Sequence, residues 1–186
     1  DNQGLLSVPG GDAALLAGDA VIEVGEANGG KITLDLSGLI GGTATNSGFI
    51  DVASSTTVGG SATILGEQVS VSGSIDASGA TGGGEVLVGG GFQGKVESLS
   101  NSSDTEVSGL ISADALVAGD GGNVIIWADE ETNFSGSLSA VGQGEGKGGF
   151  AEISGKNMLL YRGDVSLAGP GGSGTLLLDP TDITIS

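Results

Sequence analysis

The 186-residue chain contains neither cysteine nor histidine. Without cysteine there is no disulfide framework and no thiolate chemistry. Without either residue, a Ser-His-Asp or Cys-His catalytic arrangement and a typical zinc site cannot be built. No apolar run approaches the roughly 20 residues that a membrane-spanning helix requires. These absences predict a protein that is not an enzyme and carries no cofactor or metal.

Basic residues are also scarce. The chain has 5 lysines and arginines against 23 acidic residues, a formal net charge of −18. A field of this sign repels phosphate, and there is no basic stripe along the sequence. We therefore expect no nucleic-acid partner and no attraction to an anionic membrane surface. The charge favours solubility and opposes self-association.

What the chain has in abundance is glycine, with 39 residues, set between short runs in which Val, Ile and Leu alternate with polar residues. A repeat emerges when FSGSLSA from Phe134 is aligned with YRGDVSL from Tyr161, 27 residues later. GGNVIIWA from Gly121 and GGFAEISG from Gly148 agree at the same offset. The common motif is apolar-x-Gly-x-apolar, although NSGFIDV from Asn46 departs from it at its first residue. The motif glycines are Gly38, Gly48, Gly73, Gly109, Gly136 and Gly163.

Strands of about 4–6 residues cannot bury a face alone, but stacked turns of chain give each strand a parallel neighbour. The repeat therefore predicts an all-β parallel β-helix, with short strands, glycine-rich corners and about 7–9 coils of roughly 20–27 residues. Ile75, Ile111, Leu138 and Val165 should point inward. A β-sandwich is the alternative, but the hairpin turns that it needs are lacking.

Several long stretches resemble one family. ISADALVAGDGGNVIIWADEETNFSGSLSAVGQGEGKGGFAEISGK, GTLLLDPTDITIS, LLSVPGGDAALLAGDAVIEV and GGGEVLVGGGFQGKV are similar to the large exoproteins of the filamentous haemagglutinin type, which are passengers of bacterial two-partner secretion. The resemblance implies a right-handed β-helix, export by an outer-membrane transporter, and display on or release from the bacterial surface. Both ends read as cut, so residues 1–186 are interpreted as one shaft segment of a longer protein.

This interpretation leaves three hypotheses for the function of the chain. The first is a non-enzymatic stalk of an adhesin that contacts a host or neighbouring cell. The alternatives are a carbohydrate-active β-helix enzyme and a purely structural fibre component. A cleft with convergent carboxylates and exposed aromatic residues would favour the enzyme, whereas smooth faces and short corners favour the stalk.

The tripeptide Arg162-Gly163-Asp164 matches an integrin-binding signal. The repeat sets it beside Ser135-Gly136-Ser137, which predicts a flush, solvated corner and not a protruding loop. We therefore interpret it as a structural corner and keep adhesion as the less favoured hypothesis.

Other features have structural interpretations. Phe134 and Tyr161 occupy equivalent positions and should stack in the core, whereas the parity of Trp127 predicts an exposed ring. Glycosylation patterns at Asn101 and Asn133, and incomplete calcium-type repeats such as GGSGTL, are not expected to be functional. Open strand edges, with Leu176, Leu178, Ile183 and Ile185 near one of them, predict weak end-to-end association of the chain.

Overall fold

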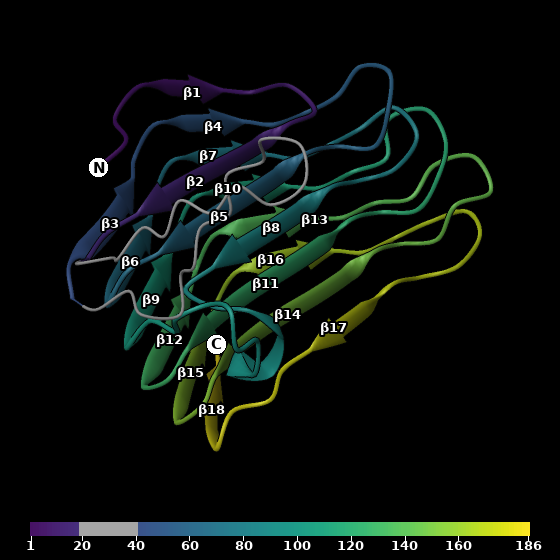
Figure 1. Cartoon of the computed structure of the whole chain (residues 1–186). Helices are drawn as coiled ribbons and strands as arrows, with labels where there is room; N and C mark the ends of the chain where they lie inside the picture. Colours follow the sequence, from purple (N-terminus) through teal and green to yellow (C-terminus); the bar gives the residue numbers. More distant parts are fainter. Residues whose placement is uncertain (19–40) are drawn as a thin grey trace.

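The computed structural model describes residues 1–18 and 41–186, in which three parallel sheets wrap around one core (Figure 1). Each described sheet has six strands, and each strand pairs with the strand three places away in sequence. This arrangement is a parallel β-helix, so the predicted fold class is confirmed. The motif glycine Gly38 lies outside the described residues.

We name the sheets A, B and C. Sheet A comprises β3 (Thr43–Asn46), β6 (Gln68–Val71), β9 (Asp104–Val107), β12 (Glu131–Phe134), β15 (Met158–Tyr161) and β18 (Asp182–Ile185). Sheet B comprises β1 (Leu5–Ser7), β4 (Phe49–Asp51), β7 (Ser74–Asp76), β10 (Leu110–Ser112), β13 (Ser137–Ser139) and β16 (Asp164–Ser166). Sheet C comprises β2 (Asp12–Leu16), β5 (Ser61–Leu65), β8 (Glu85–Val88), β11 (Asn123–Ala128), β14 (Phe150–Gly155) and β17 (Thr175–Leu177).

The described residues form six coils, which is fewer than the 7–9 predicted from repeat length. The reason is that two coils are longer than the rest. Leu5 pairs with Phe49, 44 residues later, and Ser74 pairs with Leu110, 36 residues later. The regular spacing of 27 residues holds from β10 to β16, as the repeat indicated.

The core consists of columns of inward side chains, one residue from each coil. In sheet B, Ile75, Ile111 and Leu138 are buried and in register, and Val165 packs against the same cluster. All four therefore point inward as predicted. In sheet A, Phe134 lies next to Tyr161 with ring centroids 5.5 Å apart, which confirms the expected stack.

The apolar-x-Gly-x-apolar motif forms the tight corner from sheet A to sheet B. A Cβ atom at any of the described motif glycines would overlap backbone of the coil before it. The overlapping carbonyl oxygens are those of Gly4 for Gly48, Gly48 for Gly73, Gly73 for Gly109, Gly109 for Gly136 and Gly136 for Gly163. None of these glycines has a left-handed φ. Glycine is therefore needed at this corner for the close approach of two coils and not for its backbone conformation.

A second glycine ladder, which the sequence did not reveal as such, precedes the strands of sheet C. A Cβ atom on each glycine after the first would again overlap the carbonyl oxygen of its counterpart in the previous coil. The ladder runs through Gly11, Gly60, Gly84, Gly122, Gly149 and Gly174. Across each loop between sheets B and C, a backbone hydrogen bond of 2.7–2.9 Å closes the turn, for example from the Gly122 N–H to the Ala113 carbonyl.

The exception to the motif, Asn46, is fully buried at the inward position that Val71 and Val107 occupy in the next coils. Its Oδ1 accepts a 2.7 Å hydrogen bond from Asn2 Nδ2, and its own amide donates to the Ser74 carbonyl at 3.4 Å. A polar residue is tolerated here because it is hydrogen-bonded on both sides. Within the described ranges, no helix is long and apolar enough to cross a membrane.

Candidate ligand site on the outer face of sheet C

The tripeptide Arg162-Gly163-Asp164 lies at the corner between β15 and β16. The Arg162 N–H donates to the Phe134 carbonyl at 2.8 Å, and the Asp164 N–H donates to the Gly136 carbonyl at 3.0 Å. Both bonds tie the tripeptide to the coil below. The tripeptide therefore lies in a corner between two strands, as predicted, while its interpretation as a non-adhesive corner stays a prediction. Burial, and secondly the charge of Asp164, raise the pKa of the Tyr161 hydroxyl.

Among the described connections between strands, one is longer than the rest. Residues 89–101, which we call the cover segment, leave sheet C after β8 and return where the Ser102 N–H donates to the Gly89 carbonyl at 2.6 Å. The segment contains the single turn of 3₁₀-helix η1 (Phe92–Gly94), which contacts β11 and β14 (Figure 1). The ring of Phe92 meets that of Phe150 edge-on, with centroids 5.9 Å apart.

Trp127 lies beneath the cover segment, so its predicted exposure is wrong: it is only 5% exposed. Its side chain does point to the outer face of β11, as its parity required. A Cβ atom on Gly94 would lie 2.6 Å from the indole nitrogen, so Gly94 is pressed against the ring. The indole Nε1 donates to Asp129 Oδ1 at 3.0 Å. The parity rule failed because it assumed that the outer face was open to solvent.

Glu152 of β14 is also buried by the cover segment, with none of its surface exposed. Its Oε2 accepts a 2.9 Å hydrogen bond from the Gln93 N–H, whereas its Oε1 has no hydrogen-bond partner. Burial raises the pKa of the Glu152 carboxyl, and the nearby Asp179 charge acts in the same direction. The Gln93 N–H, the Ser154 hydroxyl and the Lys95 charge partly oppose this rise.

Gln93 is the only non-glycine residue with positive φ in the described chain, at 53°. This backbone strain is compensated by an extended set of contacts. Its side-chain Nε2 donates to Asp179 Oδ2 at 3.1 Å, and its Oε1 accepts from Lys95 Nζ at 2.9 Å. The Asp179 N–H in turn donates to Ser154 Oγ at 3.0 Å. Gln93 therefore links the cover segment to two later coils.

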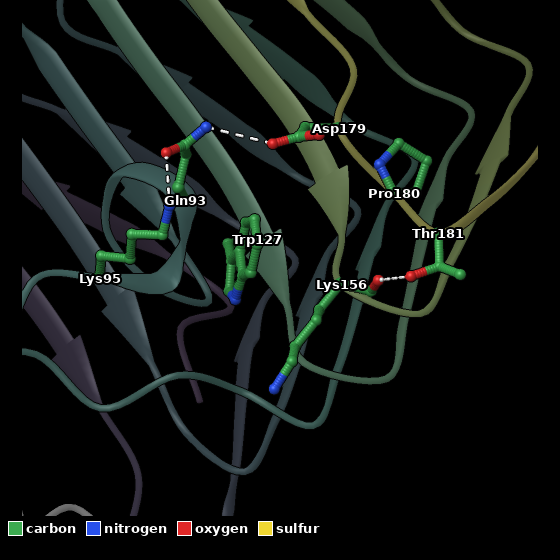
Figure 2. Close-up of a pocket in the computed structure, with 7 residues that line it drawn as sticks. All are labelled: Gln93, Lys95, Trp127, Lys156, Asp179, Pro180 and Thr181. Carbon is green, nitrogen blue, oxygen red and sulfur yellow. Dashed lines mark hydrogen bonds between the residues drawn. The ribbon is translucent and has the colours of Figure 1, made fainter.

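These contacts border a pocket of about 270 Å³ at the ends of the sheet C strands (Figure 2). Its lining residues are Gln93, Lys95, Trp127, Lys156, Asp179, Pro180 and Thr181. In Figure 2, Lys95 and Lys156 lie on either side of Trp127, and the Thr181 hydroxyl donates to the Lys156 carbonyl at 2.9 Å. Lys95, Lys156 and Asp179 are exposed at the mouth of the pocket.

Sequence reasoning missed this site because its residues come from four coils and share no motif. The irregular 36-residue step between Gly73 and Gly109 was its only signal, since the extra length of that coil is the cover segment. In the described part of the chain, no group of three or more His, Cys, Asp or Glu side chains is placed to hold a metal ion.

Asn101 and Asn133, the asparagines of the two glycosylation patterns, lie in different surroundings in the fold. Asn101 Nδ2 donates to the Gly94 carbonyl at 3.0 Å and to Asp129 Oδ1 at 3.2 Å. Asn133 lies within β12, and its Oδ1 is buried without a partner. The Asn101 amide is thus engaged in the contacts of the cover segment, which gives it a structural role.

The described strands form a three-sheet parallel β-solenoid, and the cover segment packs on the outer face of sheet C. No protein-family model and no curated protein matches the chain.

Proposed function

We propose that the chain is a non-enzymatic shaft segment of a large secreted or surface-displayed bacterial exoprotein of the filamentous haemagglutinin type. The observation that supports this most strongly is the continuity of the two glycine ladders through the stack. Ladders of this kind repeat one cross-section along an axis. Such a solenoid converts sequence length into physical reach, at about 4.8 Å per coil.

The proposal includes an outer-membrane transporter as the partner of the full-length protein, and the bacterial surface as its location. The resemblance of the sequence supports both. The adhesin and fibre versions of the proposal differ only in whether the shaft or its parent protein contacts a cell-surface ligand.

The carbohydrate-active enzyme is the less favoured function. A glycosidase of the usual kind needs two carboxyl groups flanking a bound sugar. Of the carboxylates near the pocket, Asp179 lines it and is bonded to Gln93, whereas Glu152 is buried beneath the cover segment. This arrangement supports a binding or structural role over catalysis.

Immunogold labelling of intact cells that make the protein, with an antibody raised against this chain, tests the location. We expect label on the outer surface, and its loss when the cognate outer-membrane transporter gene is deleted. Labelling confined to the cytoplasm, and unchanged by that deletion, would contradict the proposal.

A further inference from the structure

We propose that the pocket bordered by the cover segment binds one singly charged acidic sugar unit, such as a uronic acid. The inference concerns this chain alone and does not depend on the proposed export or shaft role. The first observation behind it is that positively charged side chains are concentrated at this pocket. Of the five basic residues in a chain of net charge −18, Lys95 and Lys156 both line this pocket.

The charge of the lining sets the charge of the ligand. Lys95 and Lys156 contribute two positive charges and Asp179 one negative charge, so the lining carries a net charge of about +1. One carboxylate on the ligand would neutralise this charge, whereas a phosphate dianion or a multiply sulfated sugar would leave an excess of negative charge beside Asp179.

The size and the remaining groups of the pocket set the rest of the ligand. The pocket is open to solvent on one side, and its volume of about 270 Å³ is enough for a single hexose ring. Gln93, Asp179 and Thr181 present an amide, a carboxylate and a hydroxyl, all suited to sugar hydroxyl groups. Trp127 and Pro180 supply apolar surface, although the indole is too covered to act as an open stacking platform.

The site is also built in advance. Gln93 is held in its left-handed conformation, and its side chain fixes Lys95 on one side and Asp179 on the other, as Figure 2 shows. Strained backbone of this kind persists where surrounding contacts enforce it and is concentrated at functional sites. Polar groups that are already positioned lose less freedom when a ligand binds.

The single tryptophan of the chain provides a direct readout, because Trp127 lies in the pocket. We would titrate the isolated chain with sodium glucuronate while following tryptophan fluorescence, with isothermal titration calorimetry in parallel. We expect saturable binding in the millimolar range, as is usual for a ligand of this size. Glucose, acetate and inorganic phosphate, at matched ionic strength, should each bind at least about tenfold more weakly.

Variants localise the binding. Lys95→Gln and Lys156→Gln should each weaken glucuronate binding by about five- to tenfold, and the double variant should abolish it. Lys147→Gln is the matched control, since Lys147 precedes the opposite end of the sheet C strands and is also exposed. Lys147→Gln and Lys156→Gln replace exposed side chains and should keep the unfolding midpoint of the parent chain. Lys95→Gln also removes the hydrogen bond to Gln93 Oε1, so Lys156→Gln is the variant that tests charge alone.

Three results would overturn the proposal. The first is the absence of saturable binding by both fluorescence and calorimetry. The second is equal affinity for acetate or glucose, which would mean a general anion site or an uncharged-sugar site. The third is equal loss of binding in Lys147→Gln, which would place the effect outside the pocket.

Discussion

At the scale of single residues, the corner between sheets A and B requires glycine wherever a side chain would overlap the backbone of the preceding coil. Gly4 and Gly136 occupy the same ladder, but Gly4 begins it and has nothing within 4 Å of an added Cβ atom. A Cβ atom on Gly136 would overlap the Gly109 carbonyl oxygen. The two positions therefore separate the effect of close approach from the general effect of removing a glycine.

We expect Gly136→Ala to lower the free energy of unfolding by about 1–3 kcal/mol, because backbone of two coils must move apart. Gly4→Ala should change it by less than about 0.5 kcal/mol. Urea denaturation followed by circular dichroism measures both. Equal effects at the two positions would show that the ladder is not set by contact between coils.

The buried carboxyl of Glu152 predicts an unusual dependence of stability on pH. Its pKa is raised in the folded chain, so folding favours the protonated form. The stability that this group contributes is then present at acidic pH and is lost as pH rises from about 4.5, the ordinary value, through the raised folded pKa. Removal of the charge should abolish this loss.

We therefore expect Glu152→Gln to raise the free energy of unfolding at pH 7 by about 1 kcal/mol, and to raise the urea midpoint with it. The reason is that the glutamine oxygen still accepts from the Gln93 N–H, while no charge is buried. The advantage should disappear near pH 4. Urea titrations of both chains from pH 4 to pH 8 provide the comparison. An advantage that stays constant with pH would show that Glu152 does not titrate in this range.

At the scale of strands, sheet B offers two leucines on opposite faces of neighbouring strands. Leu138 of β13 is 2% exposed, whereas Leu110 of β10 is 49% exposed. Leu138→Ala should cost about 2–5 kcal/mol through the cavity that it leaves. Leu110→Ala, the control, should cost less than about 0.5 kcal/mol. A loss below half a kcal/mol for Leu138→Ala would remove that residue from the core.

The corner from β15 to β16 carries the prediction about adhesion. Its backbone is hydrogen-bonded to the coil below at both Arg162 and Asp164, so the tripeptide cannot extend as a loop ligand does. We expect Asp164→Ala to leave the attachment of integrin-bearing animal cells to immobilised protein unchanged. A marked loss of attachment, matched by an integrin-blocking antibody on the parent chain, would establish an adhesive role for the corner.

Strand order was predictable from the sequence because each motif glycine in the described residues lies at a contact between successive coils. The inward columns of sheet B and the stack of Phe134 on Tyr161 followed from the same alignment. The exposure of Trp127 was not predictable, since it depends on residues 89–101 folding back over an outer face. No local pattern indicates that Gln93 reaches Asp179, which is 86 residues later.

At the scale of the whole molecule, the stack of described strands ends at two edge levels, beyond which no other described strand pairs. Strands β1, β2 and β3 form the first level of their sheets, and β16, β17 and β18 form the last. Near the last level, Leu176, Ile183 and Ile185 are exposed, Ile185 by 64%. Leu5, in the first level, is exposed by 67%. Each edge thus offers both unpaired backbone groups and apolar side chains to another chain.

The opposing effect is charge. A net charge of −18 repels a second copy, but salt screens this repulsion beyond about 8–10 Å at moderate ionic strength. Parallel pairing of the last level of one copy with the first level of the next would continue the same sheets. We therefore expect the isolated chain to associate weakly end to end.

Light scattering across a salt series measures this association. The mean mass should rise with protein concentration and rise further with salt. Ile183→Lys together with Ile185→Lys, which place charge at the open edge, should reduce it, whereas Phe49→Lys, at an exposed position on the side of the stack, should not. The comparison separates edge pairing from general attraction between apolar surfaces. A chain that stays monomeric at high salt and high protein concentration would contradict the prediction. It would show that pairing at the edges does not offset the entropy lost on association.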